Sequence, residues 1–270
     1  MNKTVTDFLQ KNNIDINTIQ NSNFHIKSDS EINPILNRYY IPGKTIKKEV
    51  SIAHILGYSY ENLDLGSNLI ENLSHFFNSD GTTYQRRSVG MLTMERDQCV
   101  ETLKTVSKRD TIYVRECEGK KYIITTNGMH RYHVLRFHYL NELSQVNISD
   151  KTQVKALQDK YTIPVEVQET DYIKTYSYFI LRKLIPQIRL EAEYDSNYEI
   201  TGNVVIDIQD KQKVLKDNQL LDFLQKTIMQ NKEKVDQYAD ILKYYQETIP
   251  TFKKFLEENQ IDLISQEVSV

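Results

Sequence analysis

The stretch that decides the fold is TIYVRECEGKKYIITTNGMHRYHVLRFHYLNEL, which covers residues 111–143. It begins with two runs rich in β-branched and aromatic residues, Thr111–Cys117 and Lys121–Thr126, joined by a short segment that contains Gly119. Such a pair of runs is typical of a β-hairpin. The residues that follow Gly128, MHRYHVLRFHYLNEL, have the pattern of a helix. The stretch therefore predicts a hairpin whose second strand passes through a glycine into a helix.

Further elements are predicted on both sides of this stretch. Before it, Met94–Ser107 predicts a helix and residues 45–60 contain a strand. After it, Lys151–Lys160 predicts a helix, and YTIPVEVQ, at residues 161–168, predicts a strand. Because a proline cannot donate to a β-ladder, Pro164 indicates an edge strand, a strand end or a bulge. Two more helices are expected nearer the N-terminus, at Val5–Lys11 and Asn62–Asn78.

The region beyond about residue 170 is predicted to be mostly helical. Tyr172–Ile185 predicts a helix that ends before Pro186, because proline disrupts a helix interior. A hairpin is expected within Tyr198–Ile208, with its turn at Gly202-Asn203. Three further helices are expected in a charge-balanced tail: Asp217–Lys232, Val235–Glu247 and Thr251–Glu258.

The composition is that of an ordinary globular protein. The chain has 270 residues and a formal net charge of −3, so it can bury a core without disulfides or metal. No stretch approaches the roughly 20 apolar residues of a membrane span, and the N-terminal residues lack a signal-peptide pattern. We therefore expect a cytoplasmic protein with no membrane partner. Its predicted parts are an N-terminal extension (1–44), an α+β domain (45–170) and a mostly helical C-terminal domain (171–270).

The residues that point to chemistry lie where the second strand meets the helix. Gly128 lets the backbone turn tightly and approach a ligand closely. The first turn of a helix leaves N–H groups that favour an anion, and His130 and Arg131 add donors suited to phosphate oxygens. This predicts a phosphate- or nucleotide-binding corner. The alternative is that Gly128 only makes a turn and that Arg131 pairs with a surface carboxylate.

The order of the elements adds a family resemblance. The chain has Tyr84-Gln85-Arg86-Arg87, a helix, a β-hairpin, Gly128-Met129-His130-Arg131 with its helix, and then Tyr161-Thr-Ile-Pro-Val. Over residues 45–170 this order resembles the N-terminal domain of the ParB/sulfiredoxin superfamily. The resemblance implies an α+β core with a small mixed β-sheet and flanking helices.

The resemblance also implies roles for particular residues. A phosphate- or nucleotide-binding role falls on the strand–helix junction and on the upstream basic box: Asn127, Gly128, Met129, His130, Arg131, Gln85, Arg86 and Arg87. Nucleoside triphosphate, ATP or CTP, and Mg²⁺ are the implied cofactors. His130 and Glu61 are the candidate catalytic residues, with Glu61 in the position of the base of the superfamily's free-serine kinases. Asp64 lies close to Glu61 in the sequence.

Two departures from the family narrow the activity. Met129 stands where sulfiredoxins have their catalytic cysteine, and a methionine cannot form a thiolate, so sulfinic-acid reduction is not expected. The tail after residue 210 has 9 Lys and 10 Asp or Glu, which does not suit a basic DNA-recognition domain. Chromosome partition is therefore not expected either. The G-x-H-R form is closer to the kinases and the ParB-like "nuclease" members of the superfamily.

Two functions remain open at this stage. The first is phosphoryl-transfer or phosphodiester chemistry by a small-molecule kinase, NTPase or nuclease. The second is a non-catalytic switch or adaptor, from a mobile element or phage, that binds DNA or nucleotide. Residues 86–140 carry 11 Lys or Arg against 6 Asp or Glu, so a local basic patch would be the DNA contact. The histidines of the helical run lack a zinc-like spacing, and no metal ligand is assigned. The C-terminal helices are candidates for homo-oligomer contacts.

Overall fold

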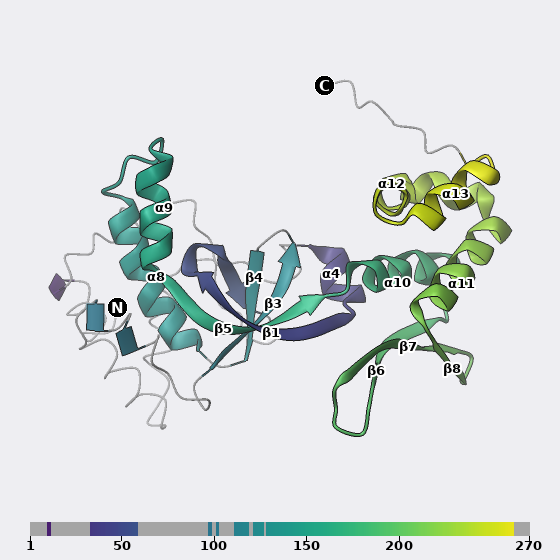
Figure 1. Cartoon of the computed structure of the whole chain (residues 1–270), viewed down its shortest axis with the longest axis horizontal. Helices are drawn as coiled ribbons and strands as arrows, with labels where there is room; N and C mark the ends of the chain where they lie inside the picture. Colours follow the sequence, from purple (N-terminus) through teal and green to yellow (C-terminus); the bar gives the residue numbers. More distant parts are fainter. Residues whose placement is uncertain are drawn as a thin grey trace. The chain divides into compact units, whose positions relative to one another are not determined.

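The computed structural model describes residues 10–11, 33–58, 97–98, 101–102, 111–118, 121–126 and 128–261 (Figure 1). The chain divides into two compact units. Unit 1 comprises Met1–Pro34 and Thr45–Glu169, and unit 2 comprises Ile35–Lys44 and Thr170–Val270. Residues 35–44, which we assigned to an N-terminal extension, thus belong to the same unit as the C-terminal region.

Unit 1 is built on a mixed β-sheet, as predicted. Among the described residues, five strands lie in the order β1-β5-β3-β4-β2. Their bounds are β1 Pro42–Ser51, β2 Ile55–Tyr58, β3 Ile112–Glu118, β4 Lys121–Thr126 and β5 Thr162–Thr170. β3 and β4 form the predicted antiparallel hairpin, whereas β2 runs parallel to β4 and β5 runs parallel to β3. The α+β class and the small mixed sheet are therefore confirmed.

Residues 45–60 contain strand, as predicted, but it is divided into two parts. β1 ends at Ser51, and a 3-10 turn, η1 (Ile52–His54), separates it from β2. The Ser51 hydroxyl accepts a hydrogen bond from the Ala53 N–H at 3.4 Å and donates one to the Gln158 carbonyl at 2.9 Å. These bonds satisfy polar groups at the break between the two strands.

The strand that contains Pro164 is internal rather than an edge. β5 lies between β1 and β3, so the first of the three alternatives given for Pro164, an edge strand, is wrong. Pro164 lies near the start of β5, and the pairs with β3 begin one residue later, at Val165 opposite Ile112. The alternative that the proline marks a strand end is confirmed, because the ladder with β3 needs no N–H from Pro164.

Two predicted helices of unit 1 are observed nearly as expected. α8 (Met129–Leu143) follows β4, and α9 (Lys151–Lys160) precedes β5. Asp150 caps α9, because its carboxylate accepts hydrogen bonds from the N–H groups of Thr152 and Gln153. Residues 97–98 and 101–102 are helical, in agreement with the helix expected there. The helix expected at Asn62–Asn78 lies outside the described residues.

Unit 2 combines helices with a small antiparallel sheet. The helices are α4 (Pro34–Tyr39), α10 (Tyr172–Leu184), α11 (Asp217–Gln230), α12 (Ala239–Thr248) and α13 (Pro250–Glu258), with a 3-10 segment η3 (Lys232–Tyr238). The sheet has the order β6-β7-β8, with bounds Arg189–Tyr194, Ile200–Ile208 and Lys211–Leu215. The mostly helical prediction holds, but it omitted β6 and β8. None of the helices in the described part of the chain has the length and apolar character needed to cross a membrane.

The predicted turn at Gly202-Asn203 is wrong, because β7 continues through both residues, where its register with β6 shifts. The turns lie at the ends of β7 instead. One is the two-residue connection Gln209-Asp210, where φ is 52° and 64°. Two successive left-handed residues match the twist of a hairpin, but glycine and asparagine are the usual residues there. The pair Gln-Asp is therefore a poor signal in the sequence.

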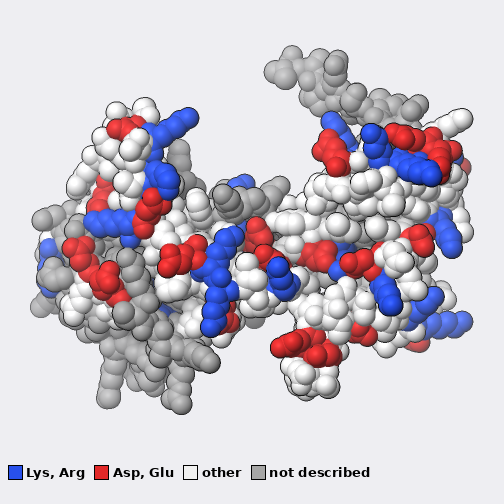
Figure 2. Space-filling view, in the orientation of Figure 1, with Lys and Arg blue, Asp and Glu red and all other residues white. Residues whose placement is uncertain are grey.

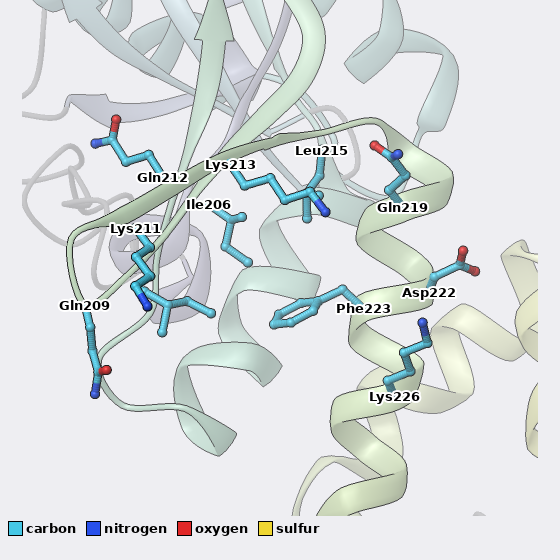
Figure 3. A pocket seen from close by; sticks show the side chains of 11 residues that line it. Ile206, Gln209, Lys211, Gln212, Lys213, Leu215, Gln219, Asp222, Phe223 and Lys226 are labelled. Atoms are coloured by element: carbon cyan, nitrogen blue, oxygen red, sulfur yellow. The ribbon is translucent and has the colours of Figure 1, made fainter.

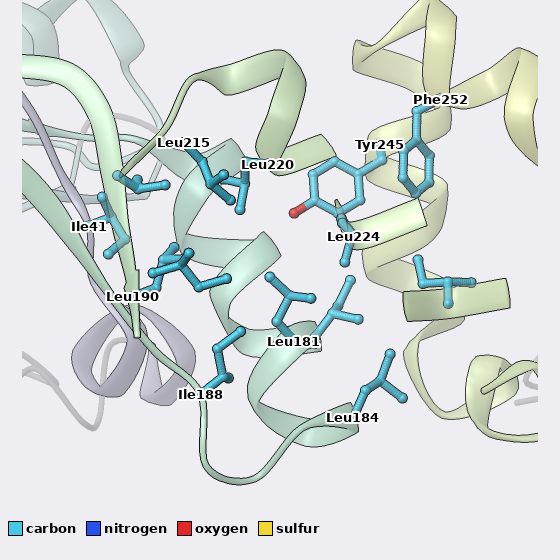
Figure 4. Packing of buried hydrophobic residues seen from close by; sticks show 14 of the residues in the cluster. Ile41, Leu181, Leu184, Ile188, Leu190, Leu215, Leu220, Leu224, Tyr245 and Phe252 are labelled. Carbon is cyan, nitrogen blue, oxygen red and sulfur yellow. The ribbon is translucent and has the colours of Figure 1, made fainter. Parts of the chain in front are cut away.

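The core of unit 2 gathers apolar side chains from its helices and from one face of its sheet (Figure 4). Leu181, Leu224 and Leu242 are completely buried in it. Tyr245 is also completely buried, and its ring lies 5.0 Å from that of Phe252. Tyr238 and Tyr245 of the C-terminal region are thus packing residues.

Candidate functional site

The predicted phosphate corner is the junction between β4 and α8. Gly128 is the N-cap of α8 and adopts a left-handed conformation, with φ 79° and ψ 0°. The Tyr132 N–H donates to the Gly128 carbonyl at 2.8 Å and closes the first turn of the helix. Because β2 and β4 are parallel, their carboxyl ends meet at the edge of the sheet where α8 begins. This is the edge at which open α/β sheets usually place ligands.

Gly128 is also required by packing inside unit 1. A Cβ atom at this position would lie 2.4 Å from Cγ1 and 2.9 Å from Cδ1 of Ile112, on the neighbouring strand β3. Both distances are far below van der Waals contact. The glycine therefore has two structural reasons to be there, its positive φ and its close approach to Ile112, in addition to any role in ligand binding.

Two side chains of α8 donate hydrogen bonds to the chain where β1 connects to β2. Tyr132 is completely buried and donates its hydroxyl to the Ile55 carbonyl at 2.8 Å. Arg136, only 3% exposed, donates from its guanidinium to the Ile52 carbonyl at 2.9 Å. Burial raises the pKa of Tyr132, and the positive charge of Arg136 opposes part of that rise. Arg136 is thus a structural residue that satisfies a carbonyl of η1.

The structure describes only part of the predicted site. Gly128 lies at the junction, and Arg131 is in the first turn of α8 with 8% of its surface exposed. Met129 and His130 form the helical backbone of the same turn. The remaining predicted residues lie outside the described part of the chain: Glu61, Gln85, Arg86, Arg87 and Asn127.

The described part of residues 86–140 contains four of the basic residues counted there, Arg115, Lys121, Arg131 and Arg136. Arg131 and Arg136 count among its basic residues, and both are buried. On the face shown in Figure 2, Lys and Arg atoms of the described residues are interspersed with Asp and Glu atoms. His138 is buried as well, at 3% exposure. Among the described residues, no three His, Cys, Asp or Glu gather as metal ligands would.

A second candidate site was not expected from the sequence. A cavity of about 630 Å³ in unit 2 is lined by residues of β7, β8 and α11 (Figure 3). The signal for it was KQKVL at residues 211–215, where strand alternation puts Lys211 and Lys213 on the same face as the buried Leu215. The sequence pattern assigns these lysines only to a charge-balanced tail.

The fold defines the protein as an α+β chain of two units, the first of which carries a strand–glycine–helix junction at the edge of a mixed sheet. No protein-family model, no curated protein and no solved structure matches it.

Proposed function

We propose that unit 1 binds the phosphate groups of a nucleotide at the junction of β4 and α8. The observation that supports this proposal best is the geometry of Gly128. Its left-handed turn starts a helix of 15 residues at the carboxyl edge of the parallel pair β2 and β4. A glycine at the N-cap also leaves the first turn of the helix without a capping side chain from that position.

The main-chain N–H groups of the first turn would make the principal contacts with phosphate. The first N–H groups of a helix have no acceptor within the helix, and the helix dipole adds a partial positive charge there. Arg131 is largely buried, so it would add its positive charge from within the fold. Charge interactions are stronger in such a low-dielectric setting than at an exposed side chain. His130, in the same turn, would donate to a phosphate oxygen.

The resemblance to the ParB/sulfiredoxin superfamily extends this binding role to chemistry. ATP or CTP with Mg²⁺ would be the ligand, and a small-molecule kinase, NTPase or nuclease reaction would follow. Phosphoryl transfer needs charge neutralisation and a group that orients the attacking oxygen, more than covalent chemistry by the protein. Glu61 would orient that oxygen, and Gln85, Arg86 and Arg87 would clamp phosphate. If nucleotide is bound but not turned over, the protein is a switch or adaptor.

The experiment that tests the binding role is calorimetry with ATP, ADP and CTP, each with and without Mg²⁺. We expect saturable binding by the wild-type chain. The variants His130→Ala and Arg131→Lys should each weaken it by roughly tenfold or more, the equivalent of one hydrogen bond to a charged group. Arg131→Lys keeps a positive charge in the buried position, so its fold is easier to preserve than that of an alanine variant.

The matched control is Lys155→Ala, which removes an exposed positive charge from α9 of the same unit. Its binding should equal that of the wild type. Thermal unfolding of every variant checks that the fold is intact. The proposal fails if no nucleotide binds, or if both first-turn variants are folded and bind as tightly as the wild type.

A further inference from the structure

The cavity of unit 2 joins an apolar floor to a cationic rim. Ile206, Ile208 and Leu215 form part of its apolar lining, together with Phe223 of α11. Phe223 projects from α11 toward the β7–β8 hairpin, between the lysines of β8 and Lys226 (Figure 3). The volume of about 630 Å³ lies within the range of pockets that take small organic ligands.

The lysines of β8 occupy positions that the sheet assigns to the core. Lys213 pairs with Ile206 and Lys211 pairs with Ile208, and directly opposed residues share a face of an antiparallel sheet. On the same face Leu215 is buried, whereas Val214, on the opposite face, is 46% exposed. The usual pattern of apolar residues toward the core is therefore inverted at the two lysines and at Val214, whereas Leu215 follows it. Such local violations are expected where function requires them.

The rim carries an excess of positive charge. Lys211 and Lys213 come from β8 and Lys226 comes from α11, so two elements contribute to it. Asp222 is the one acidic residue among the described residues of the lining. None of the three lysines pairs with a carboxylate of the described residues. An anion in the cavity would therefore meet cations that are not already neutralised.

We propose that this cavity binds a small organic anion, with a carboxylate or phosphate head held by the lysines and an apolar body resting on Phe223 and the isoleucines. We infer the anionic head of the ligand from the positive charge of the rim, and its apolar body from the apolar side chains of the floor. The site lies wholly within unit 2 and is independent of the nucleotide role proposed for unit 1. Its occupant can have an aromatic or an aliphatic body, which the experiment distinguishes.

The experiment is calorimetry on the full chain with four probes. 1-Naphthyl phosphate and decanoate combine an anionic head with an aromatic and an aliphatic body, respectively. Inorganic phosphate carries the head alone, and 1-naphthol carries the aromatic body alone. We expect at least one of the first two probes to bind roughly tenfold or more tightly than inorganic phosphate and 1-naphthol. Phe223→Leu, which keeps most of the apolar volume, should weaken 1-naphthyl phosphate more than decanoate.

The double variant Lys213→Glu with Lys226→Glu reverses the rim and should weaken the better probe by roughly tenfold or more. The matched control is Lys243→Glu on α12, an exposed lysine of the same unit that does not line the cavity. It should leave binding unchanged. Both substituted positions of the double variant are exposed, and thermal unfolding checks that unit 2 remains folded.

Several results would overturn the proposal. One is that neither amphipathic probe binds at millimolar concentration. Another is that inorganic phosphate or 1-naphthol binds as well as the amphipathic anion, since the cavity would then select only charge or only apolar surface. A third is that the double variant binds like the wild type, in which case the lysines only protect the edge strand β8 from pairing. The two proposals can be told apart by ATP binding. If ATP binding is lost in His130→Ala but kept in the double variant, ATP binds to unit 1, and that result does not bear on the cavity of unit 2.

Discussion

Replacing Gly128 with alanine should destabilise unit 1 substantially, for two reasons that the structure separates. The left-handed φ of 79° costs an alanine about 1–2 kcal/mol relative to glycine. The new Cβ would also lie 2.4 Å from Ile112 Cγ1, and overpacking of this kind costs about 1–3 kcal/mol. The lower entropy of the unfolded alanine chain returns about 0.4–1 kcal/mol. We therefore expect Gly128→Ala to lower the free energy of unfolding by about 2–4 kcal/mol.

The assay is urea unfolding followed by circular dichroism, with Gly202→Ala as the matched control. Gly202 is also left-handed, with φ 87°, but an added Cβ there has no neighbour within 4 Å. In that control the free energy of unfolding should fall only by the cost of the left-handed backbone conformation, about 1 kcal/mol. Ile112→Ala removes the clashing Cγ1 and Cδ1 atoms, so the double variant should be more stable than additivity predicts, by about 1–3 kcal/mol. A Gly128→Ala protein as stable as the Gly202→Ala protein, or an additive double variant, would refute the steric argument.

Two further predictions concern buried polar groups of unit 2. Tyr245→Phe should lower the free energy of unfolding by about 1–2 kcal/mol in urea titrations, because the buried Tyr245 hydroxyl lies 2.9 Å from Ser177 Oγ; a change below about 0.3 kcal/mol would contradict this. Lys174→Met should cost about 2 kcal/mol at pH 7, because Lys174 is 6% exposed and pairs with Asp171 and Asp217. Burial lowers the pKa of Lys174, but the bonds to the two aspartates outweigh this and leave the pKa raised. The stabilisation by the charged Lys174 is therefore complete below about pH 10.4 and is lost as the pH rises through the pKa of Lys174 in the folded protein. The difference in the free energy of unfolding between wild type and Lys174→Met should therefore narrow above about pH 10. A difference that widens there would contradict the raised pKa of Lys174.

Local patterns in unit 1 were strong enough to predict its central elements. The hairpin β3–β4 and the helix α8 each follow from a periodicity that changes from two to about 3.6 at Gly128. α9 begins at a capping aspartate, Asp150, and its predicted bounds are the observed ones. In each of these elements the local preference and the tertiary environment agree, which is the condition under which sequence patterns are reliable.

The errors occurred where tertiary context outweighed local preference. Gly202 and Asn203 have the composition of a turn, yet they lie inside β7, between the pairs that Ile200 and Val204 make with β6. Gln209-Asp210 makes the actual turn without a glycine. The strand β8 was missed because its lysines hide the alternation that Leu215 completes. A strand whose core-facing positions hold charged residues looks like solvated surface until its partner strand is known.

The candidate site also shows that the sequence alone does not give the role of a charged residue. Arg131 and Arg136 lie on the same helix and contributed equally to the positive charge counted along residues 86–140. In the structure both are buried, and Arg136 donates its guanidinium to the Ile52 carbonyl, where it stabilises a chain crossover rather than attracting a ligand. Charge counts describe what a segment contains, but the effect of a charge depends on where its side chain lies and what it already binds. The three lysines around the cavity of unit 2 belong to a tail whose charges are balanced in the sequence. In the structure these exposed lysines all line one cavity. The placement of the cations in this protein therefore indicates where an anion can bind better than their number does.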